Sequence, residues 1–221
     1  MRNERLSPDR ARAFILANTD VLAPPHVPEI RLHLAGEAHG LWLKTEEELS
    51  EIGLPPPFWA FAWAGGQALS RFVLDRPGHV AGRHVVDFAS GSGLVAIAAA
   101  KAGAASVKAV DIDPFCRESI LLNAALNAVS LDIAIEDIVG QAVATDIVLA
   151  GDVFFDKAMA APLVPWFDRL AAEGVEILIG DPGRTYLPAA RMTALATYEV
   201  PVTRVLEDAE VKRTTVWRWE A

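Results

Sequence analysis

Residues 85–97 read Val-Val-Asp-Phe-Ala-Ser-Gly-Ser-Gly-Leu-Val-Ala-Ile, and this stretch constrains the fold more than any other part of the chain. Val85 to Phe88 is a short apolar run typical of a buried parallel strand, and the Ala-rich segment Leu94 to Lys101 is typical of a buried helix. Between them, Gly91 and Gly93 allow a sharp turn and a close approach of the backbone to a ligand. A helix N-terminus beside such a turn presents free N–H groups, so the stretch predicts a ligand site in an α/β fold.

Two ligand classes fit this turn. Residues 91–96 match the G-x-G-x-x-G/A dinucleotide pattern, and Asp111 lies twenty residues after Gly91, where a ribose-binding acid belongs. Residues 87–93, Asp-x-Ala-x-Gly-x-Gly, resemble the S-adenosylmethionine loop of class I methyltransferases. Asp87 favours this second interpretation, because a carboxylate beside the loop suits the ammonium of a methionine moiety and repels a pyrophosphate. A strand–helix turn without a ligand is the third alternative.

Charge and cysteine content limit the compartment and the partners. The 221 residues carry a net charge of −9, which argues against a nucleic-acid backbone as the main partner. Cys116 is the only cysteine, so an internal disulfide and a cysteine-cluster zinc site are excluded, and the five His show no metal-ligand spacing. No apolar run has the length of a membrane span, and the N-terminus lacks the apolar core of a signal peptide. We expect a cytoplasmic, monomeric, metal-free protein.

The first 55 residues are expected to form an extension packed on one larger domain, residues 56–221. Pro8–Asn18 predicts a helix with Pro at its first position. The alternating run 30–34 predicts a half-exposed strand, which residues 41–43 would complete as a hairpin.

A helix predicted at 67–74 is followed, from Arg83 onward, by alternating strand-like and helical segments. Strands are predicted at 85–88, 107–112, 131–135, 146–150 and 175–179, then at 198–206 and 212–219, with helices at 67–74, 94–101, from 114, at 158–172 and at 188–196. This order predicts an α/β fold, with a Rossmann-like seven-stranded, mostly parallel sheet, a C-terminal antiparallel hairpin and the small N-terminal helix/hairpin extension.

An acidic residue lies at or just past the end of each of the five parallel strands. These residues are Asp87, Asp111, Asp137, Asp152 and Asp181. In an open α/β sheet, ligands bind beyond the carboxyl ends of the strands. A row of carboxylates at that edge therefore predicts a site, with Asp111 for a ribose, Asp113 as the cap of the next helix, and Asp137 for an adenine amino group or a solvated turn.

The segment 58–63 contains two Trp and two Phe within six residues. One interpretation is an aromatic plug over the core. The other is a flat wall beside an adenosine or sulfonium pocket.

Several motifs resemble the seven-β-strand methyltransferases, and within them the lysine methyltransferase family 16 group. Residues 57–70 are similar to the segment before the cofactor domain of that group, and Gly151-Asp-Val-Phe-Phe-Asp156 is similar to its Asp-x-x-Tyr/Phe element. Gly180-Asp-Pro-Gly-Arg184, the aromatic run and the N-terminal segments 14–19 and 28–34 resemble the enzymes that methylate lysines of the electron transfer flavoprotein β-subunit. The departures are Ala89 for Gly, Ala64 for Pro, and Phe155 for the commoner Tyr.

The resemblance implies S-adenosylmethionine as cofactor and a lysine of the electron transfer flavoprotein β-subunit as substrate. The implied cofactor residues are Trp63, Asp87, Ala89, Ser90, Gly91, Gly93, Asp111, Ile112, Asp137 and Gly151. The implied substrate residues are Trp59, Phe154, Asp181 and Arg184, and the implied catalytic residues are Asp152 and Phe155. Asp152 would orient the amine, with proton removal by it or by water left open. The alternatives are a small-molecule N-methyltransferase with a nicotinamide-like substrate, a dinucleotide oxidoreductase and a non-catalytic adaptor.

Overall fold

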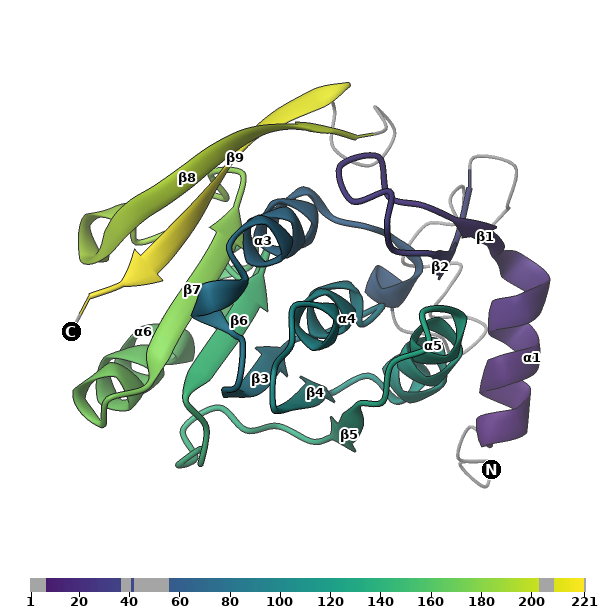
Figure 1. Ribbon diagram of the computed structural model, residues 1–221, viewed down its shortest axis with the longest axis horizontal. Coiled ribbons are helices and arrows are strands. Elements are labelled where there is room, and N and C mark those ends of the chain that lie inside the picture. The colour runs from purple at the N-terminus through teal and green to yellow at the C-terminus, as the bar shows by residue number, and fades with distance from the viewer. Residues whose placement is uncertain (1–6, 37–40, 42–55, 203–208, 221) are drawn as a thin grey trace.

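The computed structural model describes residues 7–36, 41, 56–202 and 209–220. Seven strands form one sheet in the order β5-β4-β3-β6-β7-β9-β8 (Figure 1). They are β3 (His84–Phe88), β4 (Ser106–Asp111), β5 (Asp132–Ile135), β6 (Ile147–Gly151), β7 (Glu176–Asp181), β8 (Met192–Pro201) and β9 (Val211–Trp219). The first five in that order are parallel, and β9 runs antiparallel to both β7 and β8. The expected mostly parallel sheet with a C-terminal hairpin is confirmed.

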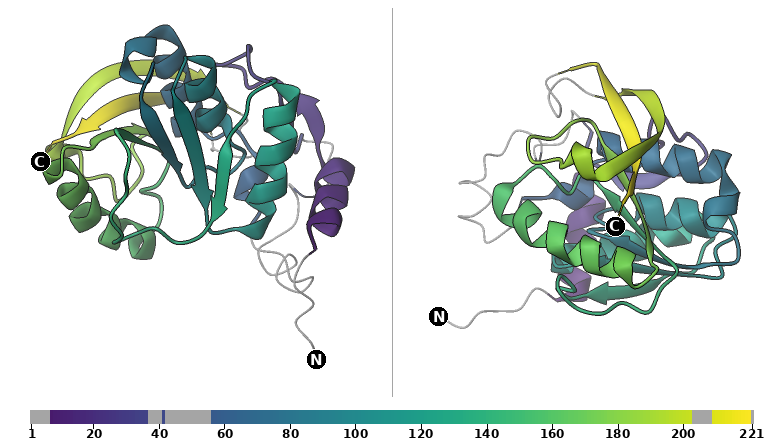
Figure 2. Two further views of the ribbon diagram at one scale, coloured as in Figure 1. Left: turned by 60° about the horizontal axis from the view of Figure 1, so that its bottom comes forward. Right: turned by 90° about the vertical axis from the view of Figure 1, so that its left-hand side faces the viewer.

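Helices cover both faces of the sheet (Figures 1 and 2). One face carries α3 (Ala64–Asp75), α4 (Leu94–Lys101) and α5 (Pro114–Leu126), and the other carries α6 (Lys157–Ala172). Val85 and Leu149 lie in the core under the first three helices, whereas Val86 and Val148 lie in the core under α6. Because both faces are buried, the parallel strands read as continuous apolar runs rather than as alternating ones. The described part of the chain also contains three short 3₁₀ helices, η1 (Phe58–Ala60), η2 (Pro77–His79) and η3 (Ala189–Arg191).

The N-terminal extension consists of α1 (Pro8–Asn18) and a two-stranded hairpin. The predicted helix 8–18 is confirmed, and the Ser7 hydroxyl accepts from Arg10 N at 3.3 Å as its cap. The hairpin pairs β1 (Asp20–Leu22) with β2 (Leu32–Leu34). β2 thus pairs with the preceding segment, across the proline-rich connection. The partner strand expected at 41–43 lies outside the described residues except for Leu41.

The expectation that β2 is half-exposed is wrong. Leu32, His33 and Leu34 are all buried, because one side of the strand packs on the helical layer of the domain while His33 approaches the Thr19 hydroxyl at 3.4 Å. The hydrophobic side chains of β2 pack with Leu94 and Ile97 of α4. The strand with the alternating sequence pattern therefore lies between α4 on one side and the segment around Thr19 on the other.

The predicted helix at 188–196 is also wrong. Only Ala189–Arg191 form a helical turn, η3, and the backbone then enters β8, which pairs with β9 from Met192 to Pro201. Ala-rich sequences favour helix only weakly, and cross-strand pairing along β9 overrides that preference. A register shift between Ala194 and Ala196 marks the bulge in this edge strand.

The remaining helices agree with the sequence to within a few residues, and α3 starts three residues earlier than expected, at Ala64. Among the helices of the described ranges, none has the length and apolar character needed to cross a membrane.

Candidate active site

A cavity of about 560 Å³ opens at the carboxyl edge of the parallel sheet. Its wall is formed by the turn after β3, the ends of β4 and β6, the start of α3 and the loop after β7. The sequence-predicted residues that line it are Trp63, Asp87, Ala89, Ser90, Gly91, Asp111, Ile112, Gly151, Asp152, Phe155 and Arg184. The structure thus gathers most of the expected site, drawn from five separate segments, into one pocket.

The glycine turn is built around the buried side chain of Asp87. One of its oxygens, Oδ2, accepts from Ser90 Oγ at 2.5 Å and from Ala96 N at 2.9 Å. Burial raises the pKa of Asp87 to about 7, and the nearby charge of Asp111 acts in the same direction. Ala89 adopts φ +54°, a left-handed backbone that explains why glycine is common at this position.

Asp111 and Asp113 have different partners at the end of β4. Asp111 Oδ2 accepts from Gly91 N at 2.8 Å, and its Oδ1 accepts from Asp113 N at 3.0 Å. Asp113 Oδ1 accepts from Phe115 N at 2.9 Å, which confirms Asp113 as the cap of α5. Burial, followed by the charge of Asp111, raises the pKa of Asp113 to about 6. Asp111 therefore braces the glycine turn while facing the pocket.

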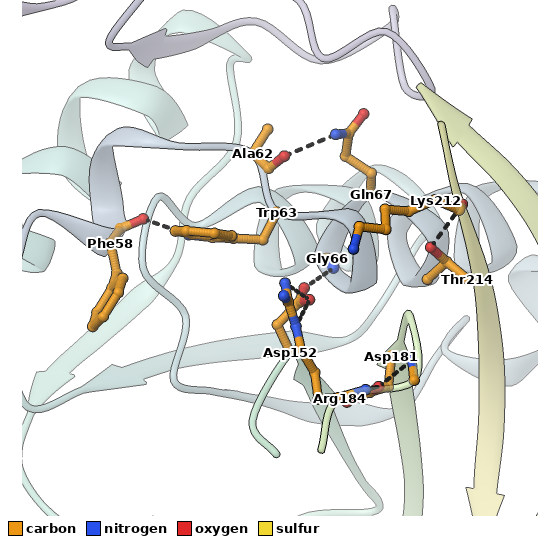
Figure 3. Close-up of polar contacts among 11 residues, drawn as sticks. Phe58, Ala62, Trp63, Gly66, Gln67, Asp152, Asp181, Arg184, Lys212 and Thr214 are labelled. Atoms are coloured by element: carbon orange, nitrogen blue, oxygen red, sulfur yellow. Dashed lines mark hydrogen bonds and ion pairs between the residues drawn. The ribbon is translucent and has the colours of Figure 1, made fainter. Parts of the chain in front are cut away.

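At the other end of the pocket, Asp152 lies just past β6 in a left-handed conformation with φ +57°. Its Oδ2 accepts from Gly66 N at 3.0 Å, at the start of α3. Its Oδ1 accepts from Arg184 Nη2 at 2.7 Å and from Arg184 Nε at 3.2 Å (Figure 3). The Arg184 guanidinium also lies 5.8 Å from the Trp63 ring centre. Sequence reasoning named Asp152, Trp63 and Arg184 but missed that they form one cluster.

An aromatic mouth surrounds this cluster. The Phe58 ring lies 5.4 Å from that of Phe155 and 5.9 Å from that of Trp63, and Trp63 Nε1 donates to Phe58 O at 3.0 Å (Figure 3). Phe58 and Phe155 are 46% and 45% exposed, so both rings face solvent at the opening. Phe58 was absent from the expected site residues, although it lies in the aromatic run that drew attention to this segment. The pocket wall also contains the buried side chain of Cys116.

Five expected residues do not line the pocket. Trp59 is buried and stacks on Phe115, with ring centres 5.7 Å apart, and Phe154 is fully buried in the core under α6. The remaining three have roles in the local backbone structure. Gly93 precedes α4 at φ +80°, the exposed Asp137 accepts from Val139 N at 2.9 Å, and the buried Asp181 accepts from Gly183 N and Arg184 N, each at 2.7 Å. The aromatic run is thus both plug and wall, with Trp59 inside and Trp63 at the pocket.

Known proteins are similar to this chain in sequence and in fold. The family model for ribosomal protein L11 methyltransferases matches residues 67–168. The chain is 38% identical to the electron transfer flavoprotein beta subunit lysine methyltransferase of Xenopus laevis, over 98% of this chain and 90% of that protein. The Homo sapiens protein of the same name is 33% identical, over 95% of this chain and 82% of its own length. The fold resembles that of magnesium protoporphyrin IX methyltransferase from Synechocystis with bound S-adenosylmethionine, at a TM-score of 0.52 and 18% identity, covering 70% of this chain and 79% of that one.

The fold and the pocket together define a class I methyltransferase, an enzyme that uses S-adenosylmethionine. Sequence identity above 30% extends over nearly the full length of the chain and includes the N-terminal extension. The chain therefore belongs to the family of electron transfer flavoprotein beta subunit lysine methyltransferases, and it is a protein-lysine N-methyltransferase.

Proposed function

We propose that this enzyme transfers methyl groups from S-adenosylmethionine to lysine side chains of the electron transfer flavoprotein β-subunit. The observation that supports this most is the continuity of one pocket, in which the glycine turn with Asp87 and Asp111 leads to Asp152 and the aromatic mouth. The cofactor half of the pocket, at the glycine turn, is thus continuous with the substrate half, at Asp152. Direct transfer between two bound molecules requires such an arrangement.

The pocket residues suit the two polar ends of the cofactor. Asp87 is the buried acid for the methionine ammonium, and Asp111, beside the exposed Ile112, is the acceptor for ribose hydroxyls. Ser90 and Gly91 provide the turn between them, and Leu94 and Val95 add apolar wall. Asp137 lies outside the pocket wall, so the proposal gives it no cofactor contact.

When bound, S-adenosylmethionine supplies a sulfonium methyl group; the amine nitrogen forms the new N–C bond as the S–C bond breaks and its electron pair stays on sulfur. The protein's part is positioning and exclusion of water. Asp152 accepts a hydrogen bond from the incoming amine and directs its lone pair, while Phe155 and Trp63 line the approach. Apolar rings around the amine also disfavour its charged form, which lowers the lysine pKa from about 10.4 in water. The substrate lysine, an ammonium in water, loses one proton to water before the transfer, and the product forms as a methylammonium.

A protein substrate fits the mouth better than a nicotinamide-like molecule. Phe58 and Phe155 are exposed at the opening. Tyr186, 42% exposed, donates from its backbone N–H to the Phe154 carbonyl at 3.2 Å. Exposed aromatic side chains grouped around a pocket are typical of protein-binding surfaces. The names of the relatives, which specify a flavoprotein subunit, favour the same class of substrate.

We further propose a cytoplasmic monomer without a nucleic-acid partner. The single cysteine, Cys116, is buried and free, as in a reducing compartment, and the net charge of −9 repels phosphate backbones. Size-exclusion chromatography with light scattering tests the oligomeric state.

The deciding experiment combines labelled S-adenosylmethionine, purified flavoprotein β-subunit and the variant Asp152→Asn. Asparagine tolerates the left-handed backbone at this position, so the fold is retained. We expect label in the β-subunit, and turnover lower by roughly tenfold or more in the variant because misplaced reacting groups are costly. Cofactor affinity should be kept. Asp168→Asn, at a surface ion pair with Arg191, is the control.

Label found only in small molecules of a cell lysate would favour the alternative function. Full turnover in Asp152→Asn would remove Asp152 from the mechanism, and an equal loss of cofactor binding would make it a cofactor ligand.

A further inference from the structure

The Asp152 carboxylate, the proposed acceptor for the substrate amine, is already paired with an arginine. Both Nε and Nη2 of Arg184 donate to Oδ1 of Asp152, and Oδ2 receives the Gly66 N–H at the start of α3 (Figure 3). The pair is partly shielded from water, with Asp152 8% exposed and the Arg184 side chain 19% exposed. Both oxygens of the acceptor are therefore engaged by positive or partially positive groups before a substrate arrives.

The loop that carries Arg184 is fixed rather than free to swing. Asp181, buried at the end of β7, accepts from the backbone N–H groups of Gly183 and Arg184 at 2.7 Å each. The guanidinium also lies over the Trp63 ring. Arg184 thus belongs to the pocket wall on the side of Asp152, where the incoming amine must enter.

Methyl transfer imposes a conflict at this place. The attacking amine must be neutral, yet an isolated carboxylate beside it would favour the ammonium form and raise the lysine pKa. We propose that Arg184 is a positioning residue that neutralises Asp152, so that Asp152 orients the lysine amine by a hydrogen bond without keeping it protonated. This inference rests on the proposed function. The lysine ammonium gives its proton to water before transfer. The nitrogen then gains the positive charge that the sulfonium loses, so the product forms as a methylammonium.

Other charged groups lie in the pocket wall and beside it. Asp87, Asp111 and Asp113 belong to the cofactor half, and the Cys116 thiol stays neutral because burial raises its pKa well above the ordinary value. Figure 3 draws Lys212 reaching from β9 toward the start of α3, a further cation on that side of Asp152. Among the described residues of the pocket wall, Arg184 is the cation that contacts the acceptor itself.

The test is the pH dependence of kcat for Arg184→Gln, Arg184→Lys and the wild type, measured from pH 6.5 to 9.5 on the purified flavoprotein β-subunit. Removing the charge should raise the pKa of the bound lysine. The kcat ratio of wild type to Arg184→Gln should then fall from about tenfold at pH 6.5 to about twofold or less at pH 9.5, the pattern of a shift of about one pKa unit. Arg184→Lys, which keeps the charge, should retain most of the wild-type pH profile.

A second readout does not depend on turnover. With S-adenosylhomocysteine bound, Arg184→Gln should bind the β-subunit at pH 7 as tightly as the wild type or more tightly, because Asp152 then attracts the ammonium. Cofactor affinity should be unchanged by calorimetry. Arg191→Gln, which removes an arginine from the surface pair with Asp168, is the matched control and should leave both measurements unaltered.

An equal fractional loss of kcat at every pH would overturn the proposal and leave Arg184 with a structural role. The same profile shift in Arg184→Lys would show that geometry, not charge, matters. If the wild type fails to methylate the β-subunit, the proposed function itself fails, an outcome distinct from both.

Discussion

At the scale of single residues, the most informative property of the pocket is the raised pKa of Asp87, about 7, caused by its burial. A carboxyl group with this pKa is only partly ionised at neutral pH. If it binds the cofactor ammonium, binding requires the ionised form, so a bound cofactor must lower this pKa. Binding and proton release are therefore linked at this residue.

Cofactor affinity should accordingly rise with pH, by about fivefold to tenfold between pH 6 and 7.5. Calorimetry across this range measures it. Asp87→Asn should bind weakly and without this pH dependence, whereas Asp113→Asn should retain it although the pKa of Asp113 is also raised, to about 6. A flat wild-type profile would contradict the assignment.

The contribution of Asp87 to the stability of the unliganded protein falls as pH rises, opposite to its effect on cofactor affinity. Because the folded pKa of Asp87 lies above its ordinary value of 3.8, its contribution to stability is present below that value and is lost as pH rises toward 7. Cofactor binding and folding thus respond to pH in opposite directions at this single residue.

A second residue-scale prediction separates the two acids after β4. Asp111→Ala should weaken cofactor binding by about 1.5–3 kcal/mol, the range for hydrogen bonds to a charged group. It should also loosen the glycine turn, because Gly91 N loses its acceptor. Asp113→Ala should instead cost about 1 kcal/mol of stability through the lost cap of α5, with a smaller effect on binding. Calorimetry measures cofactor binding and urea unfolding measures stability for both variants. The reverse pattern would assign cofactor binding to Asp113 and the structural role to Asp111.

At the scale of elements, the site depends on how closely α3 approaches the strand ends. A Cβ at Gly65 would lie 2.5 Å from Asp152 Oδ2 and closer still to the Gly180 carbonyl. Gly66 in turn packs on Gly151, where a Cβ would lie 2.9 Å from the backbone of Gly66. Glycine at these positions lets backbone meet backbone, which brings the Gly66 N–H within reach of Asp152.

Gly65→Ala should therefore force α3 away from β7. We expect a loss of about 1–3 kcal/mol in the free energy of unfolding and a fall in kcat larger than the fall in cofactor affinity. Gly78→Ala is the control, because a Cβ there meets nothing within 4 Å. Unchanged kcat in a folded Gly65→Ala protein would show that this approach does not position Asp152.

Helix α6 shows how an element tolerates residues that should break it. Pro162 and Pro165 lie inside it, and both are on its exposed side, as are Ala158 and Ala161, whose carbonyls lose their usual donors. Water can hydrogen-bond those carbonyls, while the opposite side of the helix packs into the core. The burial of that side outweighs the two missing hydrogen bonds.

At the scale of the whole molecule, a buried asparagine connects the N-terminal hairpin to the helical layer that covers the sheet. Asn123 on α5 accepts from His33 N of β2 at 2.7 Å and donates to the Ser92 carbonyl of the glycine turn at 2.8 Å. The hairpin, the helix and the glycine turn are thus joined through one side chain that is fully buried.

Asn123→Ala should lower the free energy of unfolding by about 2–4 kcal/mol, since two buried polar groups lose their partner. Asn127→Ala, which affects a more exposed contact with Arg31, should cost about 1 kcal/mol or less. Urea denaturation followed by tryptophan fluorescence measures both. Two separate transitions in the wild type would mean that the extension unfolds independently.

The sequence by itself determined the features that depend on near neighbours along the chain. Apolar runs marked the five parallel strands, proline and serine or aspartate marked the starts of α1 and α5, and the spacing of Gly91 and Gly93 marked the turn. The row of strand-end acids was also readable, because parallel strands all end at the same edge of a sheet. These features follow from local periodicity and turn chemistry, which each segment carries independently.

The tertiary structure alone decided how distant segments meet. Asp152 and Arg184 are brought together because β6 and β7 are neighbours in the sheet, and nothing in either segment specifies that pairing. Trp59 and Trp63 differ in burial because η1 turns one inward and leaves the other at the pocket. Residues 192–196 form a strand rather than a helix because they pair with β9 along its edge. In each case packing free energy, summed over partners far apart in sequence, exceeds the small local preferences that a sequence reveals.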